Sequence, residues 1–241
     1  MNHRTTSAPW VRGVARGLTW VNTRHPWSHN DHFHGWLLRR LPRRRRTVLD
    51  VGCGRGALVS LLADRFDRVD GIDADPATAA WTAARFAADG RVRIRELAFA
   101  DVRPPDGLDG YDAITMVAVL HHLDLVPALE HARELLAPGG RLLVVGLARV
   151  ATRRDVAVDL VSAVANPVVG FVKHPRVVRA ALPDGAPPVS RPAAGCEPPV
   201  VLRDAAVTFD EVVRAARSVL PGARLRRRLF FRYTLEWTAP Q

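Results

Sequence analysis

Residues 48–56 read Val-Leu-Asp-Val-Gly-Cys-Gly-Arg-Gly, directly after a threonine at position 47. The β-branched run Thr47–Val51 is typical of a short buried strand, and the glycines after it mark a tight turn. Apolar residues then recur at helical spacing, at Leu58, Leu61, Leu62 and Phe66. Together they predict a strand, a glycine-rich turn and a helix in succession, which is the repeating unit of an α/β sheet.

The same alternation continues along the chain. Further strands are expected at Arg68–Ile72, Val92–Ala98, Tyr111–Val119 and Arg141–Gly146, with helices at Pro76–Ala88 and Leu125–Leu136. A capping box at Thr208–Glu211 predicts a helix near the C-terminus, and two close strands follow at Ala223–Arg227 and Phe231–Trp237. The sequence therefore predicts a doubly wound, Rossmann-like, mostly parallel seven-stranded sheet. Helices are expected on both faces, with an antiparallel C-terminal edge.

The length of 241 residues favours one domain. We expect residues 1–46 to form a helical segment that covers cofactor or substrate, and residues 47–241 to form the Rossmann-like domain. An insert is expected at about 151–200, where a capping box at Thr152–Asp155 predicts an amphipathic helix. The segment Leu182–Pro199 carries six of the 18 prolines and predicts a loop or strap.

Composition narrows the class of protein. Hydrophobic residues make up 48% and charged residues 24%, which excludes a mainly disordered, collagen-like or disulfide-stapled chain. Two cysteines, Cys53 and Cys196, give no disulfide framework. With no secretion signal and no membrane span apparent, the expected setting is reducing and cytoplasmic. Nothing in the sequence indicates an oligomeric state.

The net charge of +11 would suggest a polyanionic partner, but its composition is unusual. Lys173 is the one lysine among 35 basic residues, so a GC-rich genome that encodes arginine at surface positions explains the charge equally well. The arginine cluster before the first strand keeps the alternative open; it comprises Arg39, Arg40, Arg43, Arg44, Arg45 and Arg46. It could form a solvated helix end or a phosphate-binding face.

The first strand-to-helix turn is where this kind of sheet binds ligands. Glycines at 52, 54 and 56 remove Cβ atoms, so that a ligand can contact the backbone. Asp73, 21 residues after Gly52, ends the second strand, where a carboxylate can accept hydrogen bonds from ribose hydroxyls. The spacing is G-x-G-x-G and Asp50 precedes it, which suits a ligand with an ammonium and a sulfonium better than a pyrophosphate.

These residues and four later segments together resemble the class I S-adenosylmethionine-dependent methyltransferases. Gly71–Pro76 resembles their ribose-binding motif and Ala100–Val102 the segment beside the adenine. Tyr111–Ile114 through Leu120–Leu123 is similar to the fourth-strand motif of the branch that contains the ubiquinone and menaquinone biosynthesis methyltransferases, and Leu135–Leu142 to the turn before the fifth strand. The resemblance covers residues 47–146 strongly and 205–238 loosely.

The resemblance implies a cofactor, S-adenosylmethionine, with S-adenosylhomocysteine as product, and a role for each matching residue. The loop of Gly52, Cys53, Gly54 and Gly56 would support the methionyl part, and main chain around Met116 and Val117 would line it. Asp73 and Ala74 would lie at the ribose, and Asp101 with the Val102 amide at the adenine. Asp50 would approach the amino group directly or through water, or else anchor the loop; Asp75 rather than Asp73 is expected to cap the next helix.

The acceptor is less constrained than the cofactor. The sequence lacks an Asn-Pro-Pro-Tyr segment after the fourth strand, which disfavours nucleobase amines, so a small organic acceptor methylated on O, N or C is expected. Alternatives are RNA or another polyanion on the arginine cluster, and an inactive cofactor-binding scaffold. His34 and His122 are candidates for proton removal. No metal site is expected, because His29, His32 and His34 lack a suitably spaced fourth ligand. Trp27–His34 and Ala151–Pro199 are expected to close over the cofactor.

Overall fold

The computed structural model describes residues 29–149, 205–229 and 232–241. They belong almost entirely to one compact unit, formed by Asn30–Ala151, Pro192–Arg228 and Arg232–Gln241. A second unit is formed by Met1–His29, Thr152–Arg191 and Leu229–Phe231. The expected helix after Thr152, the proline-rich segment and Cys196 lie outside the described residues, as does most of the N-terminal segment.

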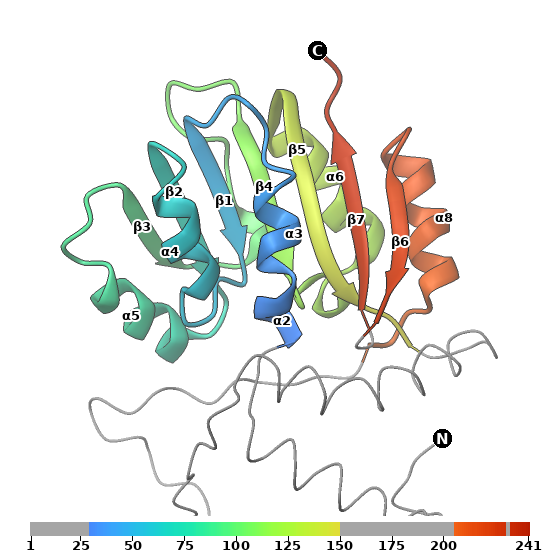
Figure 1. The fold of residues 1–241 in the computed structure, drawn as a ribbon, viewed down its shortest axis with the longest axis horizontal. Coiled ribbons are helices and arrows are strands. Elements are labelled where there is room, and N and C mark those ends of the chain that lie inside the picture. Colours follow the sequence, from blue (N-terminus) through green and yellow to red (C-terminus); the bar gives the residue numbers. More distant parts are fainter. Residues whose placement is uncertain (1–28, 150–204, 230–231) are drawn as a thin grey trace, which may run out of the picture. The chain divides into compact units, whose positions relative to one another are not determined.

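A seven-stranded sheet runs through the described unit in the order β3-β2-β1-β4-β5-β7-β6 (Figure 1). Its strands are β1 (Thr47–Val51), β2 (Arg68–Asp73), β3 (Val92–Glu96), β4 (Tyr111–Val117), β5 (Leu136–Leu147), β6 (Arg224–Arg228) and β7 (Arg232–Thr238). The pairs among β1 to β5 are parallel, whereas β7 is antiparallel to both β5 and β6. The predicted fold class is confirmed.

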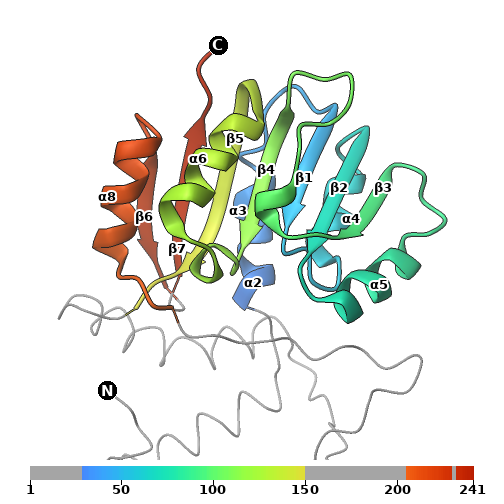
Figure 2. The same ribbon diagram turned by 180° about the vertical axis from the view of Figure 1, so that it is seen from behind.

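Helices cover both faces of the sheet. The α-helices are α2 (His29–His32), α3 (His34–Leu38), α4 (Ala57–Ala63), α5 (Pro76–Arg85), α6 (Leu125–Leu135) and α8 (Phe209–Val219); the 3₁₀ helices are η1 (Phe99–Asp101) and η2 (Leu120–His122). Figure 1 shows α3 and α4 in front of the sheet, and Figure 2 shows α6 and α8 on its other face. An apolar core fills the space beneath each layer, with Leu37 and Leu62 at its centre on the first face and Leu129 and Val212 on the second.

The predicted helix starts are confirmed by their caps. The Asp75 side chain accepts a hydrogen bond from the Thr78 amide at 2.8 Å, at the start of α5. Thr208 and Glu211 form a complete capping box at the start of α8. Asp73 is therefore not needed as a helix cap and remains available at the end of β2.

Several element boundaries were wrong by one to five residues. Helix α5 ends at Arg85, three residues before the predicted Ala88, β3 ends at Glu96, and the two C-terminal strands each begin one residue late. Strand β4 ends at Val117 because Ala118 turns to a φ of 57°, which no strand continues. Strand β5 begins at Leu136, not Arg141, because Leu136 already pairs with Tyr111 before the Pro-Gly-Gly segment shifts the register.

Candidate active site

The loop between β1 and α4 turns back through left-handed glycines. Gly52, Gly54 and Gly56 have φ values of 65°, 51° and 74°, conformations that glycine adopts without a Cβ penalty. A Cβ on Gly52 would also collide with the Val119 side chain, whereas one on Gly54 would meet nothing within 4 Å. The loop thus packs against the end of β4 at its first glycine and leaves open space over Gly54.

Asp73 ties this loop to the end of β2. Its Oδ2 accepts a hydrogen bond from the Gly54 amide at 3.0 Å, and its Oδ1 accepts one from the Asp75 amide at 3.0 Å. Each carboxylate oxygen has a second lone pair, and the side chain is only partly buried. The carboxylate is therefore preorganised at the loop and can accept further hydrogen bonds from a pair of hydroxyls.

Helix α5 holds the loop carbonyls in place. Thr82 Oγ1 donates to the Gly54 carbonyl at 2.6 Å, and Arg85 Nη1 donates to the Arg55 carbonyl at 2.7 Å. Neither residue was predicted from the sequence, because they lie 28 and 30 positions from their partners. Their helical spacing of three residues places them on one face of α5, which is the only signal they leave in the sequence.

Asp50 lies beneath the loop and joins β1 to β4. It is 3% exposed, and it accepts a hydrogen bond from Thr115 Oγ1, its register partner on β4, at 2.7 Å. Burial raises the pKa of Asp50 to about 7; the charge of Asp73 adds to the rise and the Thr115 hydrogen bond opposes it. The observed contact is an anchoring one, and an approach of Asp50 to a ligand amino group remains a prediction.

Cys53 occupies a buried position in the same loop. Its thiol is free, and burial, together with the negative charges of Asp50 and Asp73, raises its pKa well above the usual range. A thiol that stays protonated is a poor nucleophile. Cys53 packs closely over Gly71 of β2, where an added Cβ would lie 3.3 Å from its sulfur, so its side chain fills space between loop and strand.

The predicted adenine-side residues lie on η1 and directly after it. Asp101 is exposed, and Val102 is fully buried with its amide donating to the Phe99 carbonyl at 3.2 Å. Ala74 is exposed beside Asp73. The positions suit a base lying along the edge of β2 and β3, although the Val102 amide must exchange its present acceptor to bind one.

The end of β4 carries an unusual backbone conformation. Met116 is fully buried and Val117 partly buried, and the next residue, Ala118, has a φ of 57° with its amide donating to the Val145 carbonyl at 2.8 Å. A non-glycine residue in this region costs about 1 kcal/mol or more. This conformation places the Val119 side chain against Gly52. Alanine has no preference for a positive φ, so the sequence does not predict it.

The two candidate bases stand on different elements. His34 is buried in α3, with Nε2 3.7 Å from Asp31 Oδ1. His122 is exposed on η2, and its ring lies 4.0 Å from that of His121. Both elements adjoin the carboxyl edge of the parallel strands: η2 follows β4, and α2, just before His34, lies at that edge in Figure 1.

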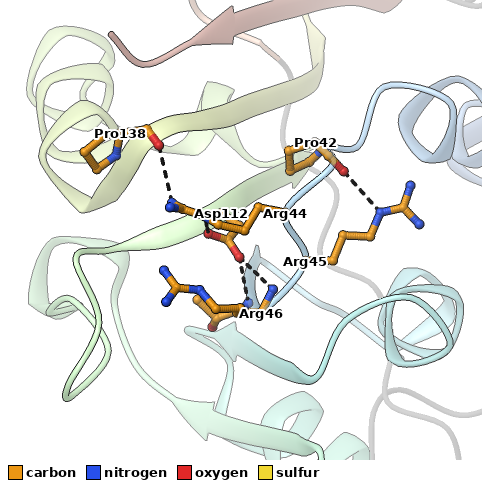
Figure 3. Close-up of polar contacts among 7 residues, drawn as sticks. Pro42, Arg44, Arg45, Arg46, Asp112 and Pro138 are labelled. Carbon is orange, nitrogen blue, oxygen red and sulfur yellow. Dashed lines mark hydrogen bonds and ion pairs between the residues drawn. The ribbon is translucent and has the colours of Figure 1, made fainter. Parts of the chain in front are cut away.

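The arginine cluster lies at the opposite edge of the sheet. Arg44 Nε donates to Asp112 Oδ1 at 2.5 Å, and Asp112 Oδ2 accepts from the amides of Arg46 and Thr47 at 2.6 and 3.3 Å (Figure 3). Arg45 Nε donates to the Pro42 carbonyl at 3.1 Å. These contacts clamp the start of β1 to the start of β4, so the cluster has a structural role away from the glycine loop.

Residues 29–149, 205–229 and 232–241 contain neither a metal-binding cluster nor a membrane-spanning helix. No three histidine, cysteine or acidic side chains there are grouped so that they could hold a metal ion. In the same ranges, no helix is long and apolar enough to cross a membrane.

The site as a whole fits a ligand with a ribose and a cationic end. Asp73 supplies acceptors for hydroxyls, the space over Gly54 admits a chain along the loop, and Asp50 lies beneath it as a buried acid. These acidic side chains suit a pyrophosphate poorly, because Asp50, a second carboxyl group beside the turn, would repel it when ionised.

Comparison with known proteins shows that this chain is similar to methyltransferases. A family model described as a methyltransferase domain matches residues 49–142. An uncharacterized methyltransferase of Mycobacterium tuberculosis is 31% identical over 219 residues, which cover 89% of this chain and 98% of that protein. A trans-aconitate 2-methyltransferase of Streptomyces avermitilis is 36% identical over 129 residues, covering 47% of this chain and 46% of that protein.

A solved structure agrees at the level of the fold. The geranyl diphosphate C-methyltransferase of Streptomyces coelicolor aligns with a TM-score of 0.56 and 14% identity, over 88% of this chain and 77% of that one. The resemblance to the quinone-biosynthesis branch is not tested by these matches. With the donor-site geometry and a full-length relative in agreement, the chain belongs to the class I S-adenosylmethionine-dependent methyltransferases, and it is an enzyme whose cofactor is S-adenosylmethionine.

Proposed function

We propose that this enzyme methylates a small organic molecule bound at the carboxyl edge of β4 and β5, beside α2 and α3. One observation carries the proposal. The Gly52–Gly56 loop, which we call the donor loop, and the arginine cluster lie at opposite ends of β1. The cluster precedes Thr47 and the loop follows Val51, a separation of about 16 Å at roughly 3.3 Å per strand residue. A nucleic acid held by the cluster would place its backbone far from the reacting methyl.

The relatives' names differ in acceptor: one, a ribosomal RNA small subunit methyltransferase C of Chromohalobacter salexigens, is 34% identical over 153 residues, whereas two of the proteins above are named for small molecules. Trans-aconitate and geranyl diphosphate, in the names of two of the proteins above, are both small organic molecules. The matches are partial or share the fold alone, so the proposal rests on the geometry and not on these names.

The sulfonium of the bound cofactor supplies an activated methyl group, and the chain's own residues must align and protect the reaction. Asp73 and the Gly52–Gly56 loop would hold the cofactor, and the turn at Ala118, which has a left-handed conformation, places Val119 against the loop at Gly52. Correct alignment of acceptor and methyl accounts for most of the rate, because displacement at carbon requires a linear approach.

A hydroxyl or ammonium acceptor must also lose a proton. We assign this task to His34 or His122, which stand on α3 and η2 respectively. A neutral imidazole is a suitable base near neutral pH. A carboxylate acceptor is already anionic and would need neither histidine, whereas a neutral carbon acceptor must lose a proton as the new carbon–carbon bond forms.

Transfer of a labelled methyl group tests the proposal. Purified enzyme with isotopically labelled S-adenosylmethionine is expected to label a compound in a small-metabolite extract, and to leave total RNA unlabelled. Labelled RNA, together with a mobility shift that weakens steeply with salt, would favour the polyanion alternative. Cofactor binding without any label transfer would favour the scaffold alternative.

A further inference from the structure

The β6–β7 hairpin carries arginines on the sheet face that packs beneath α3. Side chains alternate between faces, and the register aligns Arg224 with Glu236, Arg226 with Thr234 and Arg228 with Arg232. Glu236 faces α3, because it accepts a hydrogen bond from Arg40 Nε at 3.0 Å. The whole set therefore shares the α3 face.

Arg228 and Arg232 are an unfavourable pair in isolation. They are direct cross-strand neighbours, and like charges directly opposite each other destabilise a sheet. Burial lowers the pKa of Arg228, and the positive charges of Arg226 and Arg40 lower it further. Burial also lowers the pKa of Arg232 to about 10. Two arginine side chains thus leave adjacent positions of the hairpin on the same sheet face, and each is partly desolvated.

Polar neighbours orient both side chains. Arg232 Nη2 donates to Asn30 Oδ1 of α2 at 3.0 Å, and Arg228 Nε donates to Thr234 Oγ1 at 3.1 Å. Asn30 precedes His34 by four residues, so the helical turn that contacts Arg232 also carries one of the candidate bases. The arginine pair is therefore connected to the acceptor side of the fold.

The register also gives the distance from the methyl-donor site. Arg232 pairs with Leu147 at the end of β5, and Val145 of β5 pairs with Val117 of β4. Arg232 on β7 thus lies at the carboxyl edge three strands from β1 and its glycine loop, and Arg228 on β6 lies four strands away, which is about 14 and 19 Å at the usual strand spacing. The shorter of these distances is within the length of an extended small organic molecule.

We propose that Arg228 and Arg232 bind an anionic group of the methyl acceptor, a carboxylate or a phosphate. Paired guanidiniums suit such groups because each presents a planar fork of N–H donors. The anion would accept hydrogen bonds from both side chains and anchor the acceptor at the far end from its reacting atom. The inference rests on the small-molecule function proposed above and narrows its substrate class.

Calorimetric titration tests the site without relying on turnover. Trans-aconitate and inorganic pyrophosphate are titrated separately into enzyme saturated with S-adenosylhomocysteine, at constant ionic strength; the first probes a carboxylate site and the second a phosphate site. We expect one of them to bind wild-type enzyme. Arg228→Gln and Arg232→Gln should each weaken that binding by about tenfold or more, as loss of a charge-assisted hydrogen bond does.

Arg224→Gln is the matched control, because Arg224 lies on the same strand and face as Arg228 but four register pairs away, and it is exposed. It should change anion affinity less than about twofold, since a distant surface charge is screened. Arg232→Lys keeps the positive charge but removes the planar guanidinium. It replaces Arg232→Gln in the titration if that variant fails to fold. S-adenosylhomocysteine affinity should be unchanged in all folded variants.

The outcomes separate the two proposals. If neither anion binds the wild-type enzyme, or if Arg224→Gln weakens binding as much as Arg228→Gln, the anion site is wrong while small-molecule methylation can still stand. If the anion binds as expected but only RNA accepts a labelled methyl group, the arginine site stands and the proposed function is wrong.

Discussion

Asp50 should make the stability of this enzyme depend on pH in an unusual direction. Its pKa is raised from 3.8 to about 7 by burial, so the unfolded chain ionises this carboxyl long before the folded chain does. The contribution to stability is therefore complete at low pH and declines as pH rises from about 4 to about 7. Between pH 5 and pH 8 the loss should be about 3 kcal/mol, since each pKa unit is worth 1.36 kcal/mol.

Asp50→Asn isolates this effect from every other titrating group. Asparagine keeps an oxygen that can accept the Thr115 hydroxyl hydrogen bond and does not ionise, so the variant should lose the decline. Urea unfolding of both proteins at pH 5, 6, 7 and 8 gives the difference directly, provided the m-values agree. Parallel stability profiles from pH 5 to 8 would refute a raised pKa at Asp50.

The same carboxyl should link cofactor binding to pH. If the cofactor ammonium lies near Asp50, it favours the ionised form, so binding below pH 7 should release a proton and tighten as pH rises. Calorimetry in two buffers with different ionisation enthalpies measures that proton. Wild-type binding without proton release at pH 6 would leave Asp50 as an anchor of β1 to β4 alone.

Further predictions concern the ribose site, the candidate bases and the clamp at the other edge. Asp73→Ala should weaken S-adenosylhomocysteine binding by about 1.5–3 kcal/mol, because charge-assisted hydrogen bonds are lost; unchanged calorimetric affinity would contradict that role. His34→Ala or His122→Ala should lower turnover about a hundredfold if that histidine is the base, with cofactor affinity near wild type; normal rates in both would exclude them. Asp112→Ala should lower the free energy of unfolding in urea by about 2–4 kcal/mol, because the amides of Arg46 and Thr47 lose their acceptor. Arg44→Ala should lower it by about 1 kcal/mol or less, because the Arg44 side chain in this ion pair is partly exposed. Equal losses in the two variants would refute the amide argument.

The sequence predicted the fold well because its signals are local. The run Thr47–Val51, the cap at Asp75 and the capping box at Thr208 each encode one element through neighbouring residues. Failures occurred where pairing overrode local preference. The Pro-Gly-Gly segment at 138–140 was interpreted as a turn before the strand, but Leu136 on its near side already pairs with Tyr111, and β5 runs through it.

The site was predictable in part for the same reason. Glycines and the spacing to Asp73 marked the donor loop, whereas contacts such as Thr82 to Gly54 depend on where α5 packs. The left-handed conformation at Ala118 was not predictable, because alanine carries no preference for it.

The basic residues show most clearly why register matters to function. In the sequence, the six arginines between positions 39 and 46 form the conspicuous cluster, yet the structure pairs one of them, Arg44, with a buried carboxylate at the edge away from the glycine loop. Arg228 and Arg232 look like two more members of an arginine-rich tail until the hairpin sets them opposite each other at the carboxyl edge. The densest run of arginines in the sequence therefore lies at the amino edge of the parallel strands, opposite the glycine loop. Strand pairing places Arg228 and Arg232 at the carboxyl edge of β5, the edge at which the glycine loop follows β1.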